Sequence, residues 1–148
     1  MSEAIVTEPP VTAERKQFLF DVFVTALEGG IDYWFVVTSY RHAKADPEGT
    51  GPGAFEGKCY DLDGFYARGH EEGESTRLLI NAATVEKGLY LIRSGGSDLN
   101  AAGKALHMHH ALRSKVIGAE GVLNANDIDA ELADCIVQIG LFGEVVYG

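Results

Sequence analysis

Residues 28–40 of the chain read EGGIDYWFVVTSY, and this stretch decides how the fold is divided. Before it, apolar residues recur at helical spacing between Phe18 and Leu27, and the glycine pair is typical of a helix stop. After it, residues 33–40 are dense in aromatic and β-branched side chains, which favours a strand. Because this run is largely apolar, we expect the strand to be buried on both faces. The stretch therefore predicts a helix followed by a strand, with Thr12 as the N-cap of the helix.

The residues that follow this strand predict a small antiparallel sheet. Residues 43–57 are rich in Gly and Pro, a composition typical of a mobile loop. Residues 58–62 and 75–80 are short strand candidates, and the polar stretch His70-Glu71-Glu72 is predicted to be the tip of the hairpin between them. Strands joined in this way usually pair antiparallel, so we expect a meander.

The remainder of the chain predicts three helices. The first spans 84–93 from a Thr84 cap, and the second spans 98–116. The third begins at Asn126 and ends at Gly143, with an apolar face and an opposing polar stripe that we expect to face solvent. That stripe consists of Asp127, Glu131, Asp134 and Gln138. Residues 144–148 could form a closing strand or a docked tail.

These elements predict the α+β class: an N-terminal helix, a small antiparallel sheet and three C-terminal helices. The first and last helices are expected to cover the sheet. With no repeat and no linker in the sequence, we expect a single domain over 1–148, of which residues 1–11 form a flexible tail.

The overall charge and hydropathy exclude several classes of protein. The chain has 22 Asp plus Glu against 12 Lys plus Arg, a net charge of −10, which argues against general nucleic-acid binding. No run approaches the ~20 apolar residues of a membrane span, and the acidic N-terminus does not resemble a secretory signal. We therefore expect a cytoplasmic protein with no membrane contact. Cys59 and Cys135 are expected to be reduced thiols.

The charge is distributed unevenly along the chain. Residues 116–148 contain six acids and no Lys or Arg, whereas residues 84–115 contain five Lys and Arg and three His against two acids. In that basic segment, His107 and His110 lie three apart on the outward side of the predicted helix. Lys104 and Lys115 lie further round the same surface.

This basic surface could bind a phosphate or another anion, and its two histidines could supply half of a metal site. A solvated polar helix face explains the same residues without a ligand. No spacing matches a recognised metal motif, so we expect no bound metal and no cofactor. Trp34, which is either core or an aromatic platform for a ligand, completes the candidate ligand-binding set. That set is Trp34, Lys104, His107, His110 and Lys115.

No complete catalytic set is present. On a strand, Asp61 and Asp63 would point to the same face and could hold a cation or exchange protons. A turn leading into Gly64 explains the same residues without any chemistry, and we favour that interpretation. The sequence lacks a Gly-x-Ser-x-Gly motif, a P-loop and a dinucleotide fingerprint. We therefore expect a binding protein rather than an enzyme.

Two motifs carry a resemblance to a known family. One is Glu-Gly-Gly-x-x-Tyr-Trp at 28–34, and the other is Ile-Val-Gln-x-x-Leu-Phe-Gly-Glu-x-Val-Tyr-Gly at 136–148. Both are similar to motifs of a family of small, largely uncharacterised proteins of phages that infect actinobacteria. The resemblance implies a phage accessory protein that acts in the host cytoplasm, and it brings no catalytic residues with it.

Three functions remain open on the sequence. The favoured function is stoichiometric binding of a host protein or a small anionic metabolite, such as a nucleotide signal, with interference in host defence as the outcome. The first alternative is a metal-dependent or acid/base hydrolase that uses His107, His110 and some of Asp61, Asp63 or Glu71. The second is an assembly protein, in which the acidic stripe of the last helix contacts the basic helix of another copy in a symmetric homodimer.

Overall fold

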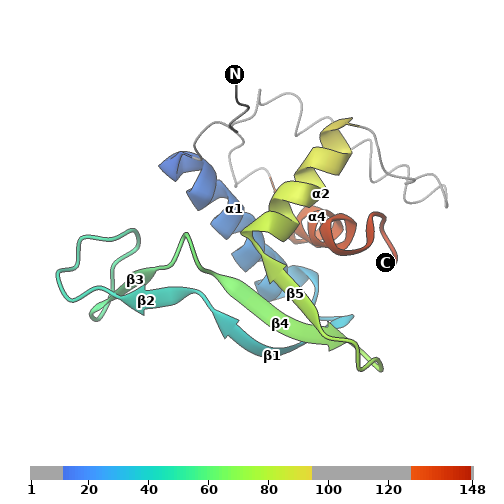
Figure 1. Ribbon diagram of the computed structural model, residues 1–148, viewed down its shortest axis with the longest axis horizontal. Helices are drawn as coiled ribbons and strands as arrows, with labels where there is room; N and C mark the ends of the chain where they lie inside the picture. The colour runs from blue at the N-terminus through green and yellow to red at the C-terminus, as the bar shows by residue number, and fades with distance from the viewer. Residues whose placement is uncertain (1–11, 95–127, 148) are drawn as a thin grey trace, which may run out of the picture.

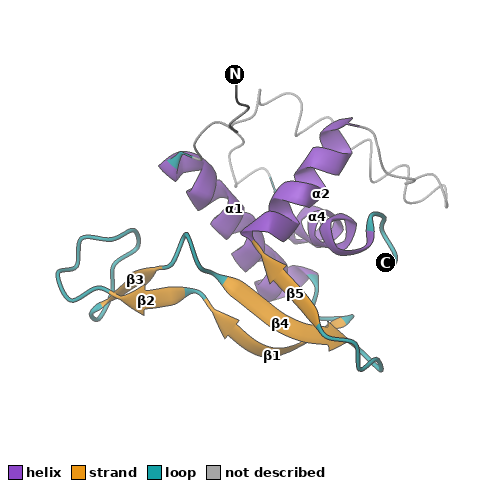
Figure 2. Cartoon of the chain, in the orientation of Figure 1, coloured by secondary structure: helices purple, strands orange, loops and turns teal. Residues whose placement is uncertain are grey.

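The computed structural model describes residues 12–94 and 128–147. The helices of these ranges are α1 (Ala13–Thr25), which continues into a π-helical turn, η1 (Ala26–Gly30), then α2 (Ala82–Ser94) and α4 (Ala130–Phe142). They lie on one side of a small antiparallel sheet (Figure 1). Figure 2 shows the same arrangement by type of element. The strands are β1 (Phe35–Arg41), β2 (Ala43–Ala45), β3 (Lys58–Tyr60), β4 (Tyr66–Glu71) and β5 (Leu78–Asn81).

The broad α+β class is confirmed, but the prediction of three C-terminal helices is wrong. In the part of the chain that the structure describes, two helices, α2 and α4, follow the sheet. The predicted helix at 98–116 lies outside the described residues.

The first helix begins as the sequence predicts and ends differently. The Arg15 N–H donates to Thr12 Oγ1 at 3.0 Å, so Thr12 is the N-cap. The glycine pair lies inside η1 instead of following the helix, and the Ile31 N–H donates to the carbonyl of Ala26 at 2.9 Å. A Cβ on Gly30 would lie 2.7 Å from the Ala130 carbonyl oxygen. Glycine at this position therefore lets η1 approach α4 closely.

The three-stranded sheet has the order β1-β4-β5, with both pairings antiparallel. The prediction that His70-Glu71-Glu72 is a hairpin tip is wrong for its first two residues, which complete β4; only Glu72 lies in the turn. Gly69 favours a turn in the sequence. In the sheet, a Cβ there would lie 2.0 Å from the Val36 carbonyl oxygen, so the close approach of β1 requires glycine.

The strand β1 is exposed on most of its length, contrary to the expectation of burial on both faces. Only Phe35 is buried among its seven residues. The described helices cover one face of the sheet and leave the other open (Figure 1). The register shifts between Val37 and Ser39, which makes Thr38 an extra residue of a β-bulge. Beyond the bulge, Tyr40 pairs with Ala67 and therefore lies on the helix side of the sheet.

The strands β2 and β3 form a separate two-stranded arm that extends away from the helices (Figure 1). The Gly- and Pro-rich loop at its end is organised around Asp46, which is only 8% exposed. The carboxylate of Asp46 accepts from the N–H groups of Thr50 and Gly51 at 3.3 and 2.9 Å. One carboxylate thus satisfies two backbone N–H groups of the loop.

The helices α2 and α4 cross at two glycines. A Cβ on Gly88 would lie 2.2 Å from the Ile136 carbonyl oxygen, and one on Gly140 would lie 2.1 Å from the Thr84 carbonyl oxygen. The two backbones therefore touch where side chains are absent. The helix α2 begins with a reciprocal cap, because Asn81 N–H donates to Thr84 Oγ1 and Thr84 N–H donates to Asn81 Oδ1, each at 3.1 Å.

The last helix is buried on all sides over residues 132–140, so the expectation of a solvent-facing polar stripe is wrong at Asp134 and Gln138, whereas Glu131 in the first turn is exposed. Residues 132–140 are all buried, including Asp134 and Gln138, which are 5% and 0% exposed. The N-cap is Asp129, which accepts from the Leu132 N–H at 2.9 Å; Asn126 and Asp127 lie outside the described residues. Gly143 ends the helix in the left-handed conformation, as predicted.

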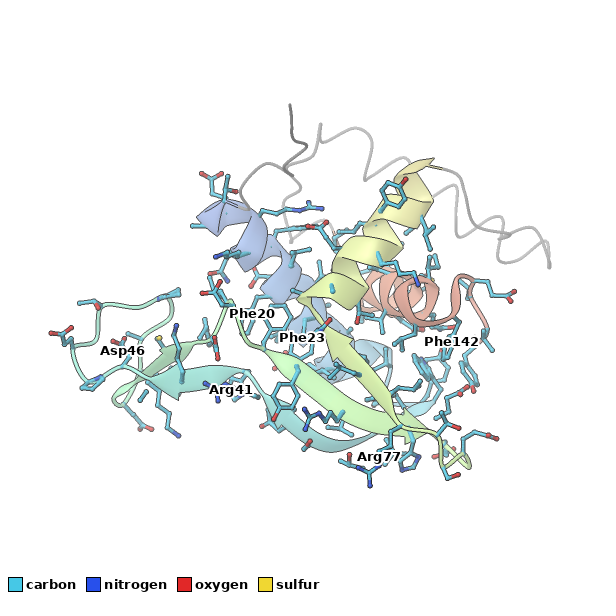
Figure 3. All side chains as sticks on the ribbon, viewed as in Figure 1. Phe20, Phe23, Arg41, Asp46, Arg77 and Phe142 are labelled. Carbon is cyan, nitrogen blue, oxygen red and sulfur yellow. The ribbon has the colours of Figure 1, made fainter. Side chains whose placement is uncertain are left out.

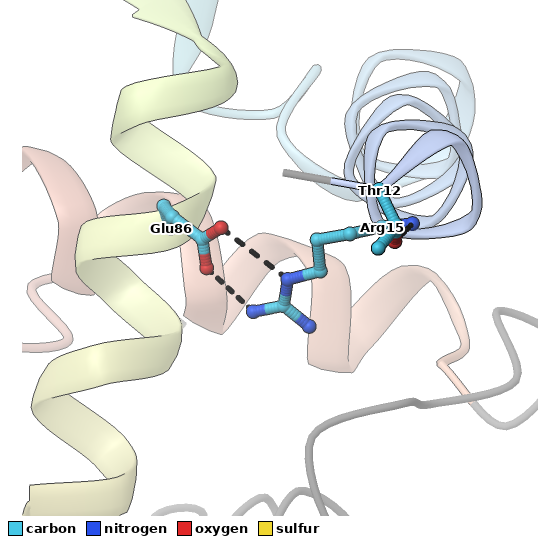
Figure 4. A network of polar contacts seen from close by, with 3 residues as sticks. All are labelled: Thr12, Arg15 and Glu86. Carbon is cyan, nitrogen blue, oxygen red and sulfur yellow. Dashed lines mark hydrogen bonds and ion pairs between the residues drawn. The ribbon is translucent and has the colours of Figure 1, made fainter. Parts of the chain in front are cut away.

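Ion pairs connect the elements around this core. The Arg15 guanidinium of α1 contacts the Glu86 carboxylate of α2 in a two-point arrangement, with Nε to Oε2 at 3.3 Å and Nη2 to Oε1 at 2.5 Å (Figure 4). Lys16 pairs with Asp63 at 2.6 Å and connects α1 to the turn before β4. Cys59 and Cys135 are free thiols, as predicted, and both are buried.

Candidate functional site

Trp34 is part of the core and offers no ligand platform. It is 2% exposed, and its Nε1–H donates to Asp134 Oδ1 at 2.8 Å. Its ring stacks on Tyr147 with centroids 5.1 Å apart and planes at 7°. The sequence left core and platform open for this residue, and the structure places it among the helices.

Asp134 and Gln138 organise a buried polar network around Trp34. The Asp134 carboxylate also accepts from the Tyr33 hydroxyl at 2.7 Å and from Gln138 Nε2 at 2.8 Å. Gln138 Oε1 in turn accepts from the backbone N–H groups of Val146 and Tyr147 at 2.7 and 2.8 Å. Residues 144–147 are therefore a docked tail, one of the two expected outcomes. The network holds the Tyr-Trp junction and the C-terminal segment together, so the motifs at 28–34 and 136–148 meet at one place.

Two tyrosines at this network resist ionisation. Burial, followed by the hydrogen bond to Asp134 and the negative charge of that carboxylate, raises the pKa of Tyr33 well above its ordinary value. The hydrogen bond that Tyr147 donates to Glu71, with smaller contributions from burial and negative charge, raises the pKa of Tyr147 to about 12. Both hydroxyls act as donors to carboxylates, which is a structural role.

Most of the sequence-predicted ligand-binding set falls outside the residues that the structure describes. Lys104, His107, His110 and Lys115 lie outside the described residues, and Trp34 is enclosed in the core.

The carboxylates proposed for hydrolysis are engaged separately. Asp61 binds Arg41, Asp63 pairs with Lys16, and Glu71 accepts from the Tyr147 hydroxyl. The Gly64 N–H donates to Asp61 Oδ1 at 2.9 Å, which supports the turn interpretation. Among the described side chains, no group of three or more His, Cys, Asp or Glu could hold a metal ion.

The face of the sheet that points away from the helices carries positive charge. Fully buried Ala67 and Ile80 mark the rows that face the helices, so the rows between them point outward. We call this outward surface the open face. Figure 3 shows Arg77 on this side. The open face consists of Val36, Ser39, Arg41, Tyr66, Arg68, His70, Arg77, Leu79 and Asn81.

The cations of the open face are only partly neutralised. Arg41 Nε donates to the buried Asp61 carboxylate at 2.7 Å, and the Arg68 guanidinium lies 4.8 Å from the centre of the Tyr66 ring. Within 12–94 and 128–147, no carboxylate forms an ion pair with Arg68 or Arg77. Val36 and Leu79, which are 38% and 43% exposed, supply apolar area beside these charges.

The groups around the Asp61 carboxylate favour its ionised form. Burial acts to raise the pKa of Asp61, but the hydrogen bonds from Arg41 and the Gly64 N–H, with the positive charges of Arg41 and Lys44, lower it overall. Asp61 therefore remains ionised at neutral pH and fixes Arg41 at the edge of the open face.

The opposite side of β1 is hollowed. Two adjoining hollows of about 340 and 630 Å³ lie between α1 with η1, the end of β1 and the arm. They share the lining residues Val24, Glu28 and His42, and we call them together the groove. Trp34 is not among the lining residues of either hollow.

Sequence reasoning missed both surfaces. Arg41, Arg68 and Arg77 are scattered in the sequence, and only the pairing of β4 between β1 and β5 brings them to one face. The alternation of Tyr66, Arg68 and His70 is the local signal that could have identified an outward row.

Comparisons with protein-family models, with curated proteins and with solved structures find no match for this chain. No helix in the described part of the chain is long and apolar enough to cross a bilayer.

Proposed function

We propose that the protein acts by stoichiometric binding and captures an acidic protein partner on its open face. The single observation that supports this most directly is the set of arginines aligned on an uncovered sheet face, two of which, Arg68 and Arg77, form no ion pair with a described carboxylate. The resemblance to phage proteins suggests that the partner is a host protein in the host cytoplasm, where its capture would interfere with host defence.

A protein suits this face better than a small molecule. The groove lies on the other side of β1, and the open face combines exposed arginines with Tyr66, Val36 and Leu79. Arginine and tyrosine are enriched among the residues that dominate protein interfaces. A broad, mixed surface of this kind matches a protein partner.

The charge of the surface selects the class of partner. Arginines on an otherwise acidic chain attract a complementary carboxylate surface and repel a second open face, so an isologous dimer through this face is disfavoured. The assembly hypothesis also loses support, because Asp134 and Gln138 of its acidic stripe are buried.

A capture experiment with matched variants tests the proposal. The immobilised protein is exposed to an actinobacterial lysate at low salt, in parallel with an Arg68→Glu, Arg77→Glu variant. The control is Lys87→Glu, which reverses an exposed cation on α2. We expect an acidic protein that is retained by the native protein and the control, released by salt, and lost by the double variant.

Two outcomes contradict the proposal. In one, the double variant retains the same proteins as the native chain. In the other, the native chain retains no protein that the double variant loses. Urea unfolding of each variant confirms that the substitutions leave the fold intact.

A further inference from the structure

We infer that the groove is a binding site for a small organic cation, an alkyl- or arylammonium ion. The inference is independent of the proposed capture of a protein, because the groove and the open face lie on opposite sides of β1. It starts from the shape of the groove. Hollows of about 340 and 630 Å³ are in the size range of small-molecule sites, and both are open to solvent at Glu28, which is exposed.

The walls of the groove are apolar and aromatic. The smaller hollow is lined by Phe23, Val24 and Leu27 of the helix and by Val37 and Tyr40 of β1. Phe23 points from α1 toward the sheet (Figure 3). The larger hollow adds Phe20, Phe55 and Tyr60, with the ring of Tyr60 4.9 Å from Phe20 and 6.1 Å from Phe55. The groove therefore suits a ligand with an apolar body.

Apart from one imidazole, the side chains of the groove that are charged at neutral pH are carboxylates. Asp21 and Glu28 line it together with His42, and the lining contains no Lys or Arg. Asp21 accepts from the neutral Gln17 Nε2 at 2.9 Å, and no described cation forms an ion pair with Asp21 or Glu28. Two carboxylates without a counter-ion at the rim of an apolar hollow favour a cationic headgroup and disfavour an anion.

Tyr40 offers a second kind of contact for a cation. It is 58% exposed and stacks on His42, with ring centroids 5.4 Å apart and planes at 17°. An ammonium group in the groove would interact with an aromatic face as well as with the carboxylates, because aromatic rings attract cations at their faces. The net charge of −10 adds a long-range attraction for cations. The ligand class is therefore defined by an apolar body and one positive charge.

Three probes of similar size test the charge requirement. They are phenethylamine, the neutral 2-phenylethanol and the anionic 3-phenylpropanoate, each titrated into the ¹⁵N-labelled protein while amide shifts are recorded. We expect phenethylamine to shift the amides of residues 20–28 and 37–42, and the alcohol to bind at least about fivefold more weakly. The acid is expected to leave these amides unshifted.

Variants test which residues bind the cation. We expect Asp21→Asn with Glu28→Gln to weaken phenethylamine at least about tenfold, and Tyr40→Ala to weaken it about threefold. The matched control is Glu72→Gln, which removes an exposed carboxylate of the β4–β5 turn. The inference is overturned if phenethylamine shifts no groove amide, if the three probes bind alike, or if the double variant binds as well as the native chain. The open-face variants are expected to bind phenethylamine normally, so failure here is distinguishable from failure of the proposed function.

Discussion

Trp34 Nε1 donates a hydrogen bond to Asp134 Oδ1 at 2.8 Å across 100 positions of sequence. This contact joins the segment that enters β1 to the middle of α4. It also gives a physical reason for the motifs at 28–34 and 136–148, since Tyr33, Trp34 and Gln138 all donate to the same carboxylate. These motifs therefore specify a buried network, and the surfaces proposed for binding lie elsewhere.

Replacement of Asp134 by alanine should destabilise the protein strongly. The substitution leaves the buried Trp34 Nε1–H and Gln138 Nε2–H without their acceptor, and we expect the free energy of unfolding to fall by about 3 kcal/mol. Urea unfolding of both proteins measures the difference. Glu131→Ala on the exposed first turn of α4 is the control and should cost less than about 1 kcal/mol. Equal losses in the two variants would contradict the importance of the network.

An alanine at Gly88 should destabilise the protein although alanine favours helices. The gain in helix propensity is about 1 kcal/mol, but a Cβ 2.2 Å from the Ile136 carbonyl oxygen would force α2 and α4 apart. We expect a net loss of about 2 kcal/mol in thermal or urea unfolding. Gly29→Ala is the matched control, because its Cβ would meet only the Ala130 Cβ at 3.8 Å. A stabilised Gly88→Ala protein would show that the helices can separate without cost.

Because of the ion pair between Asp61 and Arg41, part of the free energy of unfolding should depend on pH in the acidic range. The folded pKa of Asp61 is lowered, so its contribution is complete above the unfolded pKa of about 3.9 and is lost as the pH falls through the folded value. We expect Asp61→Asn to lose about 2 kcal/mol at neutral pH, and the difference from the native protein to shrink below about pH 4. Urea unfolding over a pH series measures this. A difference that stays constant down to pH 2, about two units below the unfolded pKa, would exclude the charge as its cause.

The Tyr147 hydroxyl should ionise at a higher pH than the hydroxyl of an ordinary tyrosine. Its pKa is raised to about 12 because its hydroxyl donates to Glu71, so this bond contributes fully below the unfolded pKa near 10 and is lost as the pH rises toward 12. Absorbance of tyrosinate followed with pH should show a step near 12 that Tyr147→Phe removes. Glu71→Gln should move that step toward 10, whereas Glu72→Gln should leave it in place. A step that does not respond to Glu71 would belong to another tyrosine.

The sequence predicts those elements whose signals are local. Thr12 and Gly143 carry the side-chain and backbone chemistry of helix ends, and both perform that role in the structure. The strand at β1 is predicted by its β-branched and aromatic composition. Its exposure is not, because composition does not tell whether a second layer covers the sheet.

The errors arise where tertiary contacts override local signals. Gly69 indicates a turn by itself, yet it is a strand residue because β1 approaches too closely for a side chain. Asp134 and Gln138 form a polar stripe by spacing, yet each finds buried partners in the Tyr-Trp junction or the C-terminal segment. Of the candidate ligand-binding set, only Trp34 lies in the described residues. Its indole N–H donates to the buried Asp134 carboxylate, so the ring belongs to the core and is not a platform for a ligand.

The bulge at Thr38 determines the register of the second half of β1. If Thr38 paired regularly, every later position of β1 would turn over, and Arg41 and Tyr40 would exchange sides. Such a slipped ladder would separate Arg41 from Asp61 and withdraw Tyr40 from the row of Ala67. The native register is further secured by the Thr38 hydroxyl, which donates to the Arg68 carbonyl at 3.1 Å. One inserted residue thus sets which side chains of β1 face each side of the sheet beyond Thr38, and the hydrogen bond of the Thr38 hydroxyl helps to hold that alignment.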